Sequence, residues 1–247
     1  MLDLSHNGVE MYLIIGTVLA LAATLQSMVG FGFNLFAAPL LIFFLKEPDE
    51  VVPALHISWL LVGLAICFRC RHQINPRRIT YWFFAALPGT VVGVWLLAKL
   101  NPTFLSRVIG IVTIAAVLLI TFKSARPLKH EKAWTIAAAG LSGMLSSSTA
   151  MAGPPLVLLG LNQNWSTIGF RADLLAYFTL LSAAIIGLYW WQGMLTAIAF
   201  RYAAAGLPGL CVGFVVGALA AKTITGKRFR YVALVLICVA GVISWLG

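Results

Sequence analysis

The stretch "MVGFGFNLFAAPLL" at residues 28–41 interrupts a long apolar segment in the first part of the chain. Helical character is lost at the Gly-Phe-Gly-Phe of residues 30–33, and an apolar run resumes at Asn34. A second interruption, "SSSTAMAGPPLVLLGL", lies at residues 146–161. Glycine permits backbone conformations that other residues avoid, and proline is favoured in the first turn of a helix. We therefore predict that each break ends one helix and begins another.

The composition indicates a membrane protein. Hydrophobic residues make up 61% of the 247 residues, charged residues 10%, and the mean hydropathy is +0.97. Soluble domains carry about 25% charged residues. The apolar runs reach the roughly 20 residues that a helix needs to cross a bilayer, and because they do not alternate with polar residues they exclude a β-barrel. We predict an all-α polytopic membrane protein, a single transmembrane domain over residues 1–247.

The membrane segments are separated by short polar connectors. We expect about 8–10 membrane helices, because some of the apolar runs are too short to cross the bilayer. The runs lie at residues 11–29, 34–45, 50–69, 79–98, 104–122, 133–149, 154–161, 168–191, 201–221 and 229–246.

An internal repeat divides the chain into two halves. A shift of 120 residues places "LPGTVVG" at residues 87–93 on "LPGLCVG" at residues 207–213. The two breaks also open corresponding parts of the halves. The first repeat therefore covers residues 11–122, and the second covers residues 132–246.

The loop charges predict that the second repeat is inverted relative to the first. Residues 69–78, 123–132 and 222–230 contain twelve of the 17 Lys and Arg, and the positive-inside rule places these loops in the cytoplasm. The first ten residues contain no Lys or Arg, so we expect both termini outside. Each broken segment must then leave one side of the membrane and return to it. Each half is expected to hold one such broken or re-entrant helix pair and three transmembrane helices.

Inverted repeats with broken helices are typical of secondary transporters, whose substrate site lies near the midplane where the half-helices meet. Helix N-termini expose unpaired N–H groups and favour anions. The candidate substrate-binding residues lie at the breaks and on the helices that follow them. They are Gly30, Phe31, Gly32, Phe33, Asn34, His56, Ser148, Thr149, Gly153, Pro154 and Arg171.

Each of these candidates has an alternative interpretation. Glycine and serine in membrane helices also serve close packing. Arg171 is either an anion ligand or an interfacial anchor, and His56 is either a protonatable donor or a packing residue. Asp173 either pairs with Arg171 or takes part in proton coupling, and it is the coupling candidate.

Other chemistry is not expected. The pair Cys67 and Cys70 has no second pair or nearby His cluster, so we predict no metal and no other cofactor. The four His are scattered, which argues against an enzyme, and we expect no catalytic residue. The net charge of +10 is explained by the loops, and no basic helix with interleaved aromatics predicts nucleic-acid binding. The expected partners are a small anion and the lipid bilayer, and a homodimer is compatible with the sequence.

The motifs at the breaks resemble the sulfite exporter TauE/SafE family of bacterial membrane transporters over nearly the whole chain. They are "GFGFNLFAAPLL" followed by "KEPDEVV", and "GPPLVLLGL" followed by "FRADLL". The resemblance implies export of sulfite, a sulfonate such as sulfoacetate, or a short carboxylate across the bacterial inner membrane, and coupling to protons or the membrane potential is expected. The residues that match the family's motifs are Gly30, Gly32, Pro39, Gly153, Pro154, Pro155 and Arg171.

The chain departs from the family pattern at the first break. Phe31, Phe33 and Asn34 stand where small residues are common, which predicts a tighter or more apolar pocket. An anion channel or an importer of the same fold is the alternative function, and an integral membrane enzyme is a less favoured one.

Overall fold

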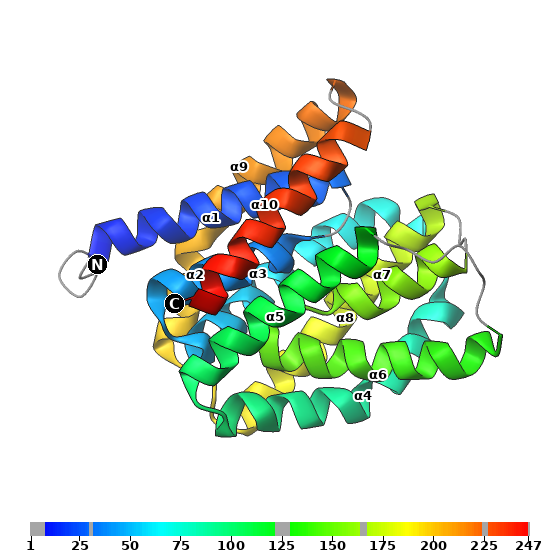
Figure 1. Cartoon of the computed structure of the whole chain (residues 1–247), viewed down its shortest axis with the longest axis horizontal. Coiled ribbons are helices and arrows are strands. Elements are labelled where there is room, and N and C mark those ends of the chain that lie inside the picture. The colour runs from blue at the N-terminus through cyan, green and yellow to red at the C-terminus, as the bar shows by residue number, and fades with distance from the viewer. Residues whose placement is uncertain (1–7, 30–31, 122–128, 164–166, 224–226, 247) are drawn as a thin grey trace.

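The computed structural model describes residues 8–29, 32–121, 129–163, 167–223 and 227–246, and these residues form ten α-helices and one 3-10 helix (Figure 1). No strand is found in these ranges, so the predicted all-α fold is confirmed. The elements are α1 (Gly8–Val29), α2 (Phe33–Leu45), α3 (Pro48–Cys70), η1 (Arg71–Gln73), α4 (Pro76–Lys99), α5 (Pro102–Thr121), α6 (Glu131–Thr149), α7 (Gly153–Asn162), α8 (Thr167–Trp191), α9 (Ala197–Thr223) and α10 (Lys227–Leu246).

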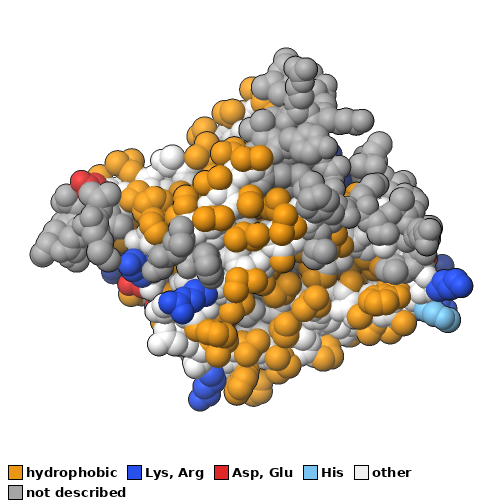
Figure 2. All heavy atoms as spheres, viewed as in Figure 1, with side chains coloured by type: hydrophobic (Ala, Val, Ile, Leu, Met, Phe, Trp, Pro, Cys, Tyr) orange, Lys and Arg blue, Asp and Glu red, His pale blue; other side chains and the backbone are white. Residues whose placement is uncertain are grey.

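The long helices fit a bilayer. In the described part of the chain, five apolar helices are long enough to cross a membrane: Gly8–Met28, Pro48–Gln73, Pro76–Lys99, Gly169–Trp191 and Ala197–Ala220. Figure 2 shows that hydrophobic side chains cover most of the visible described surface, while Lys and Arg lie toward its edges. The fold is therefore that of a polytopic helical membrane protein, as the composition predicts.

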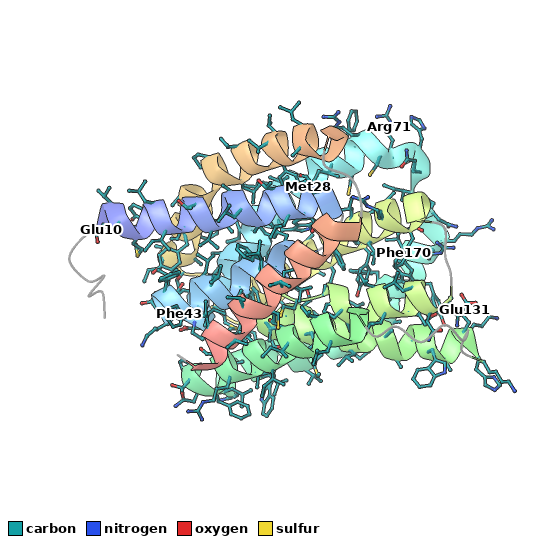
Figure 3. All side chains as sticks on the ribbon, turned by 45° about the horizontal axis from the view of Figure 1, so that its top comes forward. Glu10, Met28, Phe43, Arg71, Glu131 and Phe170 are labelled. Atoms are coloured by element: carbon teal, nitrogen blue, oxygen red, sulfur yellow. The ribbon has the colours of Figure 1, made fainter. Side chains whose placement is uncertain are left out.

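Two helices are too short to span the hydrocarbon core. With 13 and 10 residues, α2 and α7 extend only about 20 Å and 15 Å, against a core of about 30 Å. Each follows a longer helix, α1 or α6, across one of the sequence breaks. In Figure 3, α1 runs from Glu10 to Met28 and α2 returns to Phe43 near the end where the chain began. The predicted broken helix pairs are therefore present.

The repeated "LPG…G" motif makes matching contacts in the two halves. A Cβ atom added at Gly89 would lie 1.9 Å from the carbonyl oxygen of Gly140, and one added at Gly209 would lie 2.0 Å from that of Gly16. Thus α4 packs closely on α6 and α9 packs closely on α1. Each motif holds the first helix of the other half's broken pair. The matching contacts agree with two repeats, and their inverted relationship stays a prediction.

The centre of the molecule is built around α3 and α8, which pack against each other. Large side chains of α8 are fully buried there, including Tyr177, Leu181 and Tyr189. On α3, His56 and Trp59 are buried one helical turn apart and face the same side of the helix. These two central helices carry the side chains that lie against the helix breaks.

Candidate functional site

The first break depends on Gly32. Its φ of 108° lies in a region that side chains rarely adopt, and α2 begins at the next residue. The side chain of Gln26 reaches across the break, where its Oε1 accepts a 3.1 Å hydrogen bond from the backbone N–H of Phe33. One of the otherwise unpaired N–H groups of the α2 N-terminus is therefore satisfied. The candidates Gly30 and Phe31 lie outside the described residues.

The second break begins at Ala150, which takes a left-handed conformation with φ of 62° after the last turn of α6. Helix α7 starts at Gly153, and Pro154 and Pro155 contribute no N–H to its first turn. The Tyr177 hydroxyl donates to Ser142 Oγ over 3.1 Å, and Ser142 in turn donates to the carbonyl oxygen of Ala152 over 2.6 Å. This chain of hydrogen bonds fixes the segment between α6 and α7.

A direct hydrogen bond joins the two breaks. Asn34 Nδ2 donates to the carbonyl oxygen of Ala150 over 2.7 Å, although the residues are 116 positions apart. A carbonyl can only accept, so the contact assigns the amide orientation and leaves Oδ1 for another partner. The breaks that the sequence places 115 to 120 residues apart therefore meet in space.

A cavity lies where the two breaks meet. Its lining comes from both breaks and from the facing sides of α1, α3, α6 and α8. The predicted candidates in the lining are Gly32, Phe33, Asn34, His56 and Gly153. No Asp, Glu, Lys or Arg is among the described residues that line it. The cavity is thus polar at a few points and carries no full charge of its own.

His56 ties three helices together beside the cavity. Its ring is 1% exposed, Nε2 lies 2.9 Å from the carbonyl oxygen of Ser146, and Nδ1 lies 3.0 Å from Ser182 Oγ. Because the carbonyl only accepts, the hydrogen must sit on Nε2. Nδ1 then accepts from the Ser182 hydroxyl when the ring is neutral, and donates to it when the ring is charged. His56 therefore both packs the core and lines the cavity.

Trp59 is a lining residue that the sequence reasoning missed. Its side chain is 3% exposed, and its ring centroid lies 5.5 Å from that of Phe33. Within the described ranges, neither its indole Nε1 nor Asn34 Oδ1 has a hydrogen-bond partner. The available signal was its position three residues after His56, which puts both on one helix face.

Three predicted candidates from the second break do not line the cavity. The Ser148 hydroxyl donates to the carbonyl oxygen of Met144 over 2.7 Å, and the Thr149 hydroxyl donates to that of Leu145 over 2.6 Å. Both bonds return to the preceding turn of α6, so these hydroxyls are used within the helix. Pro154 is buried in the first turn of α7 and is also outside the lining.

The charged candidates lie away from the cavity. Asp173 accepts from Arg78 Nη1 over 3.0 Å and from the backbone N–H of Asn75 over 2.7 Å. The partner of Asp173 is therefore Arg78 and not Arg171, the pairing that the sequence offered. Arg171 is half-buried and is not among the residues that line the cavity. It lies seven residues before the lining residue Phe178, which is about 10 Å along α8.

Known proteins place the chain in a family. The sequence model of the sulfite exporter TauE/SafE family matches residues 15–243. The chain belongs to this family. A relative named "Probable sulfite/organosulfonate exporter TauE" from Cupriavidus necator is 26% identical over 211 residues, which cover 83% of this chain and 78% of the relative. No solved structure matches the chain. The TauE/SafE resemblance read from the break motifs is confirmed, and the protein is a multi-pass membrane protein of a transporter family.

Proposed function

We propose that this TauE/SafE family member exports a small sulfur-containing or organic anion, such as sulfite, a sulfonate or a short carboxylate. The substrate binds in the cavity between the two helix breaks. The observation that carries this proposal is the hydrogen bond from Asn34 to Ala150, which brings both breaks to the wall of one cavity. No catalytic step is part of the function.

The electrostatics of the cavity favour an anion without using a charged side chain. Helix α2 begins at the cavity wall, and a helix N-terminus carries about half a positive charge. Trp59 also lines the cavity, and its indole N–H adds a neutral donor near Phe33 at the start of α2. Such weak, distributed attraction suits a transporter, because a substrate that is bound too tightly is not released.

Alternating access would come from the inverted halves rocking about the cavity. The matching glycine contacts of α4 on α6 and of α9 on α1 support this rocking motion. Each half packs closely on the first helix of the other half's broken pair. We further propose that the basic loops face the cytoplasm of a bacterial inner membrane, with both termini outside. Figure 3 agrees with this arrangement, since Arg71 and Glu131 lie toward one end and Glu10 toward the other. We also propose that transport of the anion is coupled to protons through Asp173 or His56.

Flux in proteoliposomes tests the function. We expect the wild-type chain to move at least one of sulfite, sulfoacetate and acetate faster than protein-free vesicles, with a rate that saturates. Trp59→Phe should slow this flux, whereas the matched control Trp95→Phe, at a side chain that is 56% exposed, should not. Flux that does not saturate would indicate a channel. If none of the three anions moves, the proposed function is wrong.

A further inference from the structure

Two residues that line the cavity, Trp59 and Asn34, each carry a buried polar atom that lacks a partner within the described chain, and the two atoms have opposite hydrogen-bonding character. We infer that the cavity recognises a small, singly charged oxyanion that carries a donor hydrogen of its own, as in a singly protonated oxyanion or a hydroxylated sulfonate. Trp59 binds an oxygen of this ligand, and Asn34 binds its donor hydrogen. The inference rests on the proposed transport function and names the class of substrate.

Trp59 supplies the donor. An indole N–H can only donate, and this one is buried on a side chain that is 3% exposed. A buried donor without an acceptor is unfavourable, and native proteins keep few of them. An oxygen of a bound oxyanion would satisfy it, and the surrounding exclusion of water would strengthen that bond.

Asn34 supplies the acceptor. Its Nδ2 is committed to the Ala150 carbonyl oxygen at 2.7 Å, so the atom left over is Oδ1. A carbonyl oxygen repels the oxygens of a fully deprotonated anion. It therefore selects a ligand that presents an O–H or N–H group on that side.

The absence of full charges in the described lining sets the charge of the ligand. A buried ion needs compensating charge or hydrogen bonds, and here the compensation comes from one helix N-terminus and neutral donors. That is enough for a single negative charge and poor for two. A protonated oxyanion meets both demands, because its proton lowers the charge and fills the acceptor.

Three other polar atoms of the residues that line the cavity already have hydrogen-bond partners. Both nitrogens of His56 are engaged, and Gln26 Oε1 already accepts from Phe33. Two further buried atoms lack partners among the described residues, Ser58 Oγ and Asn162 Oδ1, and neither residue lines this cavity.

The experiment compares two ligands that differ by one hydroxyl. Binding of 2-hydroxyethanesulfonate and of ethanesulfonate to the purified full-length protein is measured by calorimetry. We expect the hydroxylated ligand to bind about tenfold more tightly, the usual effect of leaving a buried acceptor unpaired. Equal affinities would overturn the inference while leaving the transport function intact. Failure of all anions to bind or move would instead overturn the transport function.

Two variants assign the roles. Trp59→Phe should weaken the binding of both sulfonates by a similar factor and keep the preference for the hydroxylated one. Asn34→Leu should abolish the preference. If Asn34→Leu does not fold, the wild-type ligand pair still decides. Trp95→Phe, the exposed control, should change neither affinity. A Trp59→Phe protein with unchanged affinities would contradict the role of Trp59.

A third probe distinguishes the two sources of the donor. Sulfite at mildly acidic pH, where the singly protonated ion predominates, is compared with 2-hydroxyethanesulfonate. Tighter binding of sulfite identifies hydrogen sulfite as the ligand, and tighter binding of the sulfonate identifies a hydroxylated sulfonate. Either result supports the inference.

Discussion

The Asn34 side chain donates a 2.7 Å hydrogen bond to the carbonyl oxygen of Ala150, and this contact fastens the first helix break to the second. Ala150 is the left-handed residue at which α6 ends, so its carbonyl is one that the helix itself does not use in a regular turn. Asn34 lies in the first turn of α2. A polar side chain of the first half therefore donates a hydrogen bond to a backbone carbonyl of the second half, at the wall of the cavity.

Removing this contact should loosen the junction. We expect Asn34→Leu to lower the free energy of unfolding by about 1–3 kcal/mol, because the buried Ala150 carbonyl loses its donor. The measurement is the unfolding midpoint in detergent, compared with that of Gln192→Leu at an exposed position. An unchanged midpoint for Asn34→Leu would show that the junction does not depend on this bond.

The paired glycines should be intolerant of a methyl group. Gly89→Ala and Gly209→Ala would each place a Cβ atom about 2 Å from a backbone carbonyl oxygen, that of Gly140 or Gly16. Overpacking of this kind costs typically 1–3 kcal/mol, and the two losses should be similar because the contacts match.

The control for the paired glycines is Gly187→Ala, since a Cβ atom there meets nothing within 4 Å. This variant should be neutral or slightly more stable, because alanine favours a helix. Thermal unfolding of the three proteins checks the prediction. A Gly187→Ala protein as unstable as Gly89→Ala would contradict the packing argument.

The glycines of the two breaks should respond differently. Gly32→Ala forces a side chain into a φ of 108°, which costs on the order of 1–3 kcal/mol, and it moves the start of α2 at the cavity. Gly153 has no positive φ, and a Cβ atom there would lie 3.8 Å from Phe178, an ordinary contact. We expect flux to fall strongly in Gly32→Ala and little in Gly153→Ala. Equal losses of flux in the two variants would contradict the different roles of the two glycines.

The two arginines near Asp173 should also differ. Arg78→Ala removes the ion-pair partner of a carboxylate that is 1% exposed, so we expect a loss of about 2 kcal/mol in stability. Arg171→Ala should cost less, because Arg171 does not pair with Asp173. The double variant Arg78→Ala/Asp173→Asn should recover part of the loss. Chemical unfolding of the set measures these differences, and a larger loss for Arg171→Ala would refute the assignment.

The helices were predictable from the sequence because apolar length and Gly or Pro breaks determine them locally. The segment predicted at residues 34–45 became Phe33–Leu45, and that at residues 154–161 became Gly153–Asn162. The broken helix pairs were predicted from the loop charges. These charges place both ends of a run of about 35 residues on the same side, so the run has to turn back within the membrane.

The site was only partly predictable, because a helix that is apolar all round does not reveal which face meets the cavity. Gly32, Asn34 and His56 were predicted and lie in the lining. On α6 the lining residue is Ser146, while Ser148 and Thr149 bond back to their own helix. The rotation of α6 is set by its packing on α4, a tertiary contact that the sequence does not display.

The position of the bound anion decides whether the cavity between the breaks is the substrate site. Selenite is a sulfite analogue whose selenium can be located by anomalous scattering in a crystal of the full-length protein. We expect selenium in the cavity, beside the contact of Asn34 with Ala150 and with one oxygen within hydrogen-bonding distance of Trp59 Nε1. Selenium at the charged end of α8 beside Arg171, with the cavity empty, would contradict it.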